Sequence, residues 1–141
     1  MKVFAKTEYA CIAVLELAQT YDSGDPVRIR DIADQHGIPS RFLVQILLQL
    51  KGAGLVASTR GAAGGYQLVR SPDEITLGEV MGTIDGNEPI NTSTSSDSPI
   101  SRVLLRAWRT VAAKEHEMLK EITFADLVAR LKGEVEQMYY I

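Results

Sequence analysis

The sequence of 141 residues has one cysteine, Cys11, two histidines and no long apolar run. A single cysteine excludes an intrachain disulfide and an all-cysteine metal site within one chain. No window approaches the roughly 18 uninterrupted apolar residues of a membrane-spanning helix. The apolar N-terminus is interrupted by Glu8 and Glu16 and lacks a cleavage motif, which favours a buried helix over a signal peptide. These absences predict a cytoplasmic protein without a membrane partner.

Patterns for catalysis and phosphate binding are also missing. The glycine-rich stretch Arg60–Tyr66, RGAAGGY, lacks the lysine and hydroxyl residue of a P-loop and precedes a strand instead of a helix. His36 and His116 have no carboxylate at a spacing that the sequence reveals. Cys11 lies on a helix that we expect to be buried, where a thiol is usually inert. We therefore predict that the protein is not an enzyme and binds no metal.

Charge is unevenly distributed along the chain, whose formal net charge is −3. Residues 27–70 carry six basic and two acidic side chains, a net charge of +4. Residues 1–26 carry two basic and four acidic side chains, and residues 71–141 carry seven and twelve, giving −2 and −5. A basic segment within an acidic chain is typical of a local surface that faces phosphates.

Hydrophobic periodicity predicts a mainly helical first half. Residues 6–20 form a helix that is apolar on most sides, and a short helix follows it and ends at Gly37. A second short helix begins at Pro39 and carries one apolar stripe, formed by Leu43, Ile46, Leu47 and Leu50. The strand-like runs LVAST and YQLVR come next, joined by the loop Gly61–Gly65. A helix-turn-helix followed directly by a β-hairpin is the winged form of this motif.

The second half reads as helices around one polar loop. A T-x-x-E capping box at Thr76 starts a helix that closes at Gly86. Residues 87–99 are rich in serine and threonine and have no periodicity, which predicts a flexible polar loop. A long amphipathic helix follows, and a last helix is expected to start at Thr123 and stop at Gly133.

A winged helix-turn-helix suggests how DNA would be contacted. The second helix of the motif enters the major groove, where arginine and glutamine pair with guanine and adenine. An arginine at the base of the hairpin can enter a narrow minor groove, and glycines allow close approach of the backbone. The predicted DNA-binding residues are Ser40, Arg41 and Gln45 on the helix, and Arg60, Gly61, Gly64, Gly65 and Tyr66 in the wing. For the three helix residues, the alternative is that they are merely solvated surface.

The stretch DIADQHGIPSRFLVQILLQLKGAGLVASTRGAAGGYQLVRSPDEITLGEVMGTIDG resembles the Rrf2 family of bacterial winged helix-turn-helix transcriptional regulators, which includes IscR, NsrR and CymR. The runs KTEYACIAVLELA and ITFADLV also fit, so the resemblance covers nearly the whole chain. It implies a homodimer whose long helices cross and whose wings read a pseudo-palindromic operator. By position it carries base contact to Arg41 and Gln45 and minor-groove insertion to Arg60. The apolar stripe expected at the dimer contact comprises Leu104, Trp108, Val111 and Met118.

The sequence departs from the family pattern at three places. Val44 stands where many members have a glutamate that helps to choose target sites, so the operator cannot be inferred from relatives. Ala62 and Ala63 replace the usual proline and glycine of the wing. Cluster-binding members carry three cysteines in the loop and at the start of the long helix, and this chain has none there. Glu8 matches a carboxylate ligand of some relatives but cannot hold a cluster alone, so we predict no iron–sulfur cofactor.

Together these features predict a mainly α fold with a small β-hairpin wing. Its parts would be a winged helix-turn-helix domain at 1–86, the flexible loop at 87–99, and a dimerisation helix plus C-terminal helix at 100–141. The predicted function is a dimeric, cluster-independent DNA-binding regulator, a repressor by resemblance to the family. The rival is an adaptor whose basic face binds an acidic protein. Control by a small-molecule or protein effector, by oxidation of Cys11, or by no signal at all remains open.

Overall fold

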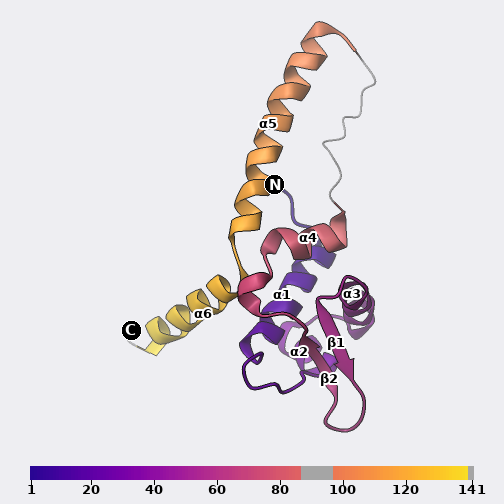
Figure 1. Ribbon diagram of the computed structural model, residues 1–141, viewed down its shortest axis with the longest axis vertical. Coiled ribbons are helices and arrows are strands. Elements are labelled where there is room, and N and C mark those ends of the chain that lie inside the picture. Colours follow the sequence, from indigo (N-terminus) through magenta and orange to yellow (C-terminus); the bar gives the residue numbers. More distant parts are fainter. Residues whose placement is uncertain (87–96, 140–141) are drawn as a thin grey trace.

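The computed structural model of the chain describes residues 1–86 and 97–139. Within these residues, helices dominate and one hairpin supplies the only sheet (Figure 1). In chain order the elements are α1 (Ala5–Gln19), α2 (Ile29–His36), α3 (Ser40–Gly52), β1 (Val56–Thr59), β2 (Gly65–Leu68), the 3-10 turn η1 (Pro72–Glu74), α4 (Leu77–Asp85), α5 (Pro99–Glu121) and α6 (Phe124–Tyr139). The predicted mainly helical class with a hairpin wing is confirmed. Most of the predicted flexible loop, residues 87–96, lies outside the described residues.

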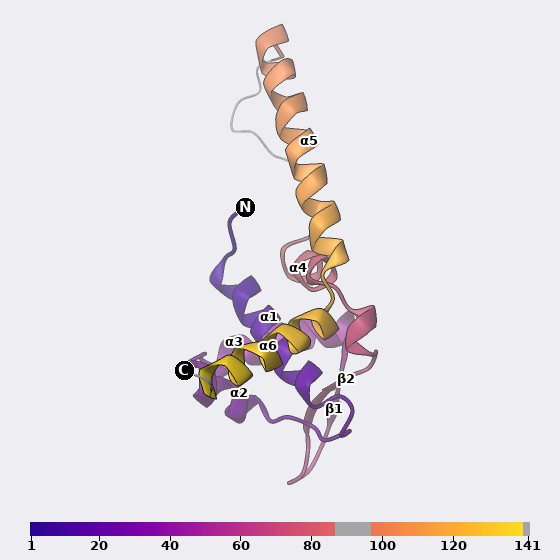
Figure 2. The ribbon, with the colours of Figure 1, turned by 90° about the vertical axis from the view of Figure 1, so that its left-hand side faces the viewer.

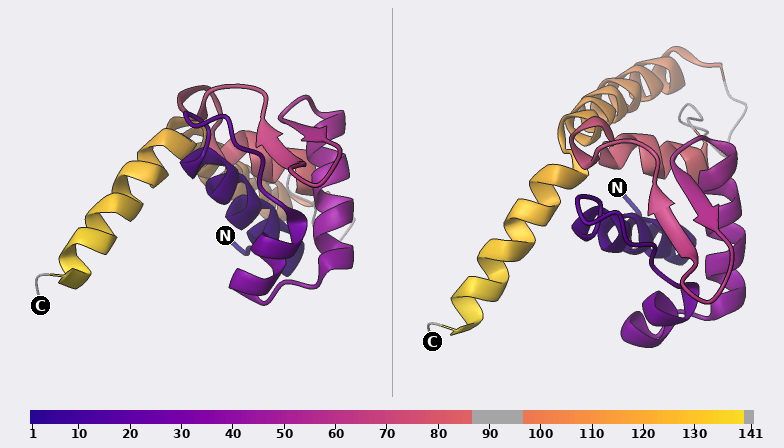
Figure 3. Two further views of the ribbon diagram at one scale, coloured as in Figure 1. Left: turned by 90° about the horizontal axis from the view of Figure 1, so that it is seen from below. Right: turned by 60° about the horizontal axis from the view of Figure 1, so that its bottom comes forward.

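Helix α1 lies at the centre of the core, as predicted from the apolar residues on most of its sides. It packs against α3, α4 and α6, and its small residues Ala10 and Ala13 are fully buried, which allows neighbouring helices to approach closely. Figure 3 shows α3 and α6 on opposite sides of α1. The surface of α3 that faces away from α1 is therefore remote from the C-terminal helix.

The helix-turn-helix turn forms at Gly37. Its backbone adopts the left-handed conformation with φ of 65°, which favours glycine, and the amide of the next residue, Ile38, donates to the carbonyl of Ala33 at 3.0 Å. Helix α3 then begins after Pro39 and buries one stripe, made of Leu43, Ile46, Leu47 and Leu50. This is the stripe that the periodicity predicted, and it fixes which face of α3 points outward.

The wing is a two-stranded hairpin tied to the chain at a third point. Strands β1 and β2 pair antiparallel, with Ala57 opposite Gln67. Val27, which precedes α2, exchanges two backbone hydrogen bonds of 2.8 Å with Tyr66 on β2. The end of the wing next to its loop is therefore fixed to the start of the helix-turn-helix.

Helix α5 is an arm that leaves the winged domain, as Figures 1 and 2 both show. Within the described residues, none of its side chains is buried. Its C-terminal end is held by a short joint, in which Thr76 and Thr123 form an isolated β-bridge. The amide of Leu77 donates to Ile122 at 2.9 Å, and the amide of Phe124 donates to Ile75 at 2.9 Å.

Helix α6 begins as predicted but ends later. Asp126 and Thr123 cap each other's amides at 3.0 Å, which is the expected helix start. The expected stop at Gly133 is wrong, because the helix continues to Tyr139. Gly133 does not take a positive φ, and the residues that follow it include good helix formers. An isolated glycine weakens a helix without ending it.

Candidate nucleic-acid interface

The outward face of α3 carries the residues predicted to contact bases. Ser40, Arg41 and Gln45 are all exposed within the first two turns of the helix. The side chain of the N-cap residue Pro39 makes no capping hydrogen bond, and within the described residues the amides of Ser40 and Arg41 keep their hydrogen-bonding capacity for another partner. Free amides at a helix start favour anions such as phosphate. The guanidinium of Arg41 lies 5.2 Å from the ring centre of Phe42, a cation–π contact that restricts its orientation.

Arg60 stands directly after β1, at the start of the wing loop and not at the base of the hairpin as expected, and it is exposed. Within residues 1–86 and 97–139, no hydrogen bond or ion pair engages its guanidinium. Two other arginines of the basic segment are engaged, because Arg70 pairs with Glu79 and Arg28 donates to the carbonyl of Ala62. Arg60 is thus the wing arginine whose charge is available to an external group.

The wing glycines are explained by close backbone contacts, within the loop for Gly64 and with Val27 for Gly65. A Cβ on Gly64 would lie 2.1 Å from the carbonyl oxygen of Thr59, and one on Gly65 would lie 2.5 Å from that of Val27. Gly61 has φ of 104°, and its carbonyl accepts from the amide of Gly64 at 3.0 Å. Gly64 is buried and shapes the loop. Direct DNA contact by these glycines remains a prediction.

Tyr66, the second residue of β2, is half-buried. Its side chain packs against the hydrophobic core, and its backbone makes the bridge to Val27. These contacts anchor β2, so the residue has a structural reason to be present. Contact of Tyr66 with DNA is still a prediction.

Sequence reasoning missed two arginines as candidate contacts. Arg28 and Arg30 are exposed at the start of α2 and line, with the wing loop, a hollow of about 450 Å³. They lie far from the wing in sequence, and the bridge between Val27 and Tyr66 brings them together. The run RIR at the start of the helix-turn-helix was the signal in the sequence that could have identified them. Two cations beside the wing suit contact with a phosphate backbone.

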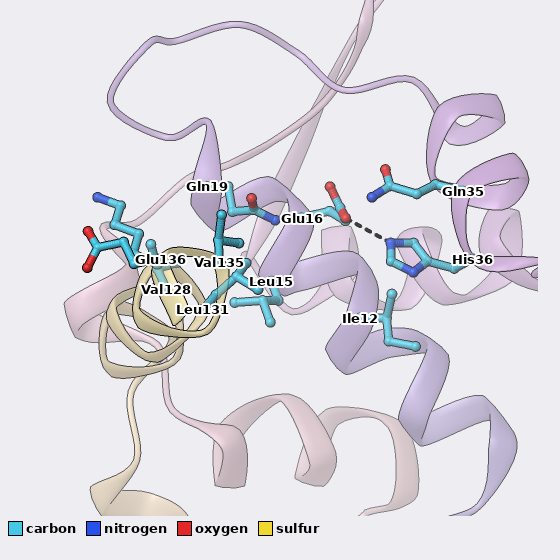
Figure 4. Close-up of a pocket in the computed structure, with 11 residues that line it drawn as sticks. Ile12, Leu15, Glu16, Gln19, Gln35, His36, Val128, Leu131, Val135 and Glu136 are labelled. Atoms are coloured by element: carbon cyan, nitrogen blue, oxygen red, sulfur yellow. Dashed lines mark hydrogen bonds and ion pairs between the residues drawn. The ribbon is translucent and has the colours of Figure 1, made fainter. Parts of the chain in front are cut away.

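A second hollow lies on another side of the domain (Figure 4). It measures about 630 Å³ between α1, α2 and α6, and its apolar lining includes Ile12, Leu15 and Val128. At one wall His36 Nε2 lies 2.8 Å from Glu16 Oε1. His36 thus has a carboxylate partner one helix earlier in the chain, at a separation that the sequence alone does not reveal. This pair joins α1 to the end of α2.

Cys11 is half-buried on α1, where full burial was expected. Burial raises the pKa of its thiol from the ordinary value of 9.0 to about 11, and the negative charges of Asp85 and Glu8 add to this shift. The thiol is therefore protonated at neutral pH. Since the thiolate is the reactive and metal-binding form, this setting opposes redox and ligand roles for Cys11.

The sequence profile of the Rrf2 family, described as "Iron-dependent Transcriptional regulator", matches residues 3–130. The chain belongs to the Rrf2 family. Its winged helix-turn-helix is thus that of a transcriptional regulator, a class that is not enzymatic. Among the helices of residues 1–86 and 97–139, none combines the length and the apolar character needed to cross a bilayer.

Known Rrf2 relatives match along most of their length. The transcriptional regulator CymR of Bacillus subtilis is 33% identical over 142 residues, covering 100% of both chains. The regulator IscR of Aliivibrio salmonicida is 33% identical, covering 98% of this chain and 82% of its own. The solved structure of CymR (YrzC), the global cysteine regulator of B. subtilis, has a TM-score of 0.80 at 30% identity, covering 92% of this chain and 98% of that one.

Iron dependence, which the Rrf2 description names, does not fit the donor set of this chain. Iron–sulfur clusters are held by cysteine thiolates, with histidine replacing some of them in a few types. The whole sequence supplies one cysteine, and its raised pKa disfavours the thiolate. Within the described residues, no group of three or more histidine, cysteine, aspartate or glutamate side chains could hold a metal ion. We derive no role for iron from these residues.

Proposed function

We propose that this Rrf2 protein is a homodimeric, sequence-specific DNA-binding repressor that works without an iron–sulfur cluster. The observation that carries the proposal is the set of unengaged polar groups on two adjoining elements. Arg41 and Gln45 are exposed on α3, and Arg60 is exposed at the wing. Each α3 would lie in a major groove, and each Arg60 would enter the flanking minor groove.

The dimer is supported by the uncovered apolar stripe of α5. Its predicted members Leu104, Trp108, Val111 and Met118 are all exposed, with Trp108 at 49% and Val111 at 65%. The alternative, that this stripe packs on its own domain, is disfavoured because no residue of α5 is buried within the described chain. A second copy would cover the stripe through a two-fold contact, the commonest symmetry of oligomers.

A DNA partner is favoured over an acidic protein partner by the chemistry of α3. Arginine and glutamine side chains suit base edges, and the uncapped helix start suits phosphate. For DNA, the logarithm of the binding constant should fall by about 0.9 per released phosphate contact for each tenfold rise in salt. A DNA-binding protein should leave a heparin column only at high salt. Elution already at low salt would favour the adaptor hypothesis.

The first test is selection of genomic DNA fragments by the purified, metal-free dimer, followed by sequencing of the retained fragments. We expect enrichment of a pseudo-palindrome whose half-sites lie about one or two helical turns apart, since the two α3 helices are related by symmetry. Failure to enrich any sequence, with the dimer intact by ultracentrifugation, would contradict sequence-specific binding by the unliganded protein.

Substitution of Arg60 by alanine should weaken operator binding by about tenfold and reduce the preference for A·T-rich flanks. The reason is that a narrow minor groove attracts an inserted guanidinium. Fluorescence anisotropy with operators that differ only in their flanks measures both effects. Arg130→Ala on α6 removes the same charge from another exposed position and should change affinity little. Equal behaviour of the two variants would refute the wing assignment.

We also propose that the protein acts in the cytoplasm and has no catalytic activity. The raised pKa of Cys11 favours control by a small-molecule or protein effector over control by oxidation of this thiol.

A further inference from the structure

Two apolar side chains are exposed on α3 beside the residues proposed to read bases. Val44 is 41% exposed and Leu48 is 56% exposed, whereas the buried stripe of the same helix is fully covered. They are four residues apart, so they lie one above the other on successive turns. We call this pair the Val44–Leu48 strip.

The strip belongs to the outward face of α3. At about 100° per residue, Arg41, Gln45 and Leu48 cluster opposite the buried stripe, and Val44 lies at the edge of that cluster. The strip is therefore beside both polar base-reading candidates. Whatever surface receives Arg41 and Gln45 also receives Leu48.

Both side chains of the strip keep a large part of their surface exposed in the folded monomer. Single exposed apolar residues are ordinary on protein surfaces. Two branched ones stacked next to an arginine and a glutamine, at the start of a recognition helix, instead form a mixed polar and apolar surface. Such a surface fits a partner that offers hydrogen-bonding groups and an apolar group side by side.

The major groove offers one apolar group, the C5-methyl of thymine. Cytosine presents an amino donor at its edge, and neither valine nor leucine can accept its hydrogen bond, so burial of that donor is unfavourable. We propose that the Val44–Leu48 strip specifies thymine in each half-site by packing on its methyl group. This inference rests on the proposed DNA-binding function and adds to it one base preference.

The expected size of the effect is modest and measurable. Burial of one methyl-sized group against an apolar side chain corresponds to about a fourfold change in affinity. Adenine beside the contacted thymine is the expected base for Gln45, since glutamine pairs with the N6 and N7 edge of adenine. The half-site should therefore contain an adenine and a thymine at neighbouring positions.

The test replaces thymine by deoxyuridine, which removes only the methyl group. Each thymine of the selected operator is replaced in turn, and binding is measured for the wild-type dimer and for Val44→Ala and Leu48→Ala. The wild type should lose about fourfold affinity at one or two positions in each half-site. At those positions the penalty should disappear in at least one variant. Gln49→Ala, exposed on the other flank of α3, is the matched control and should keep the full penalty.

The outcomes separate this inference from the proposed function. If no operator is selected, both sequence-specific DNA binding by the free protein and the thymine preference of the strip are contradicted. If an operator is selected but deoxyuridine is tolerated at every position, only the strip assignment is wrong. The same holds if both alanine variants keep the wild-type penalty, because the methyl group is then read by other residues.

Discussion

Replacement of Trp108 by glutamate is expected to convert the dimer into monomers and to weaken operator binding at least a hundredfold. Trp108 lies at the middle of the exposed stripe of α5, with Leu104 and Val111 on the adjoining turns. A carboxylate buried in an apolar contact must lose its hydration without gaining a partner. A monomer reads one half-site only, and linked binding of two sites commonly adds about 10²–10⁴ in affinity.

Sedimentation equilibrium gives the oligomeric state, and anisotropy with a full operator gives the affinity. Thr110→Glu introduces the same charge two residues away on the opposite face of α5, so this variant should remain dimeric. Circular dichroism should report equal helix content for both variants. A Trp108→Glu protein that sediments as a dimer would show that the stripe is not the dimer contact.

Substitution of Gly64 by alanine should lower the free energy of unfolding by about 1–3 kcal/mol and weaken operator binding by tenfold or more. The added Cβ would lie 2.1 Å from the carbonyl oxygen of Thr59 and 2.8 Å from the carbonyl carbon of Arg60. Both atoms belong to the backbone and cannot rotate away. The loop must open, and Arg60 moves with it.

Urea denaturation and operator binding together measure the two effects. Gly52→Ala is the matched control, since no atom lies within 4 Å of its added Cβ and the residue is helical. That change should be neutral or raise the free energy of unfolding by up to about 1 kcal/mol. Wild-type affinity and flank preference in Gly64→Ala would mean that the wing conformation is not required for binding.

The fold was largely predictable because its signals are local. The α3 stripe repeats with helical period, Gly37 needs a left-handed backbone, and the Thr76 hydroxyl accepts the Glu79 amide at 3.1 Å as its capping box indicates. Each of these depends on residues within one or two turns. The outward face of α3, and with it the exposure of Arg41 and Gln45, then follows by elimination.

Features that depend on distant pairing could not be predicted. The Val27–Tyr66 bridge and the Glu16–His36 pair join segments whose approach is decided by packing. The contacts of Gly64 with the opposite side of its own loop likewise cannot be predicted from the sequence. At Gly133 the glycine predicted a helix end, but the helix continues because the residues beyond it favour helical structure. The family resemblance indicated which residues are candidates for DNA contact. The structure shows, in addition, how Gly64 and Arg28 shape the wing loop.

Helix α5 meets the winged domain near its C-terminal end, so a small tilt there moves its far end by a larger distance. Its 23 residues extend for about 34 Å at about 1.5 Å per residue, and its joint to the domain is a bridge between Thr76 and Thr123. A tilt of about 10° at that joint sweeps the far end through about 6 Å, nearly two base-pair steps of about 3.4 Å each. With two arms clamped in a dimer, the same tilt would swing the two winged domains apart or together. A small change in the angle between α4 and α5 would thus produce a large change in the distance between the two winged domains. The preferred half-site spacing would change without any change in the wing.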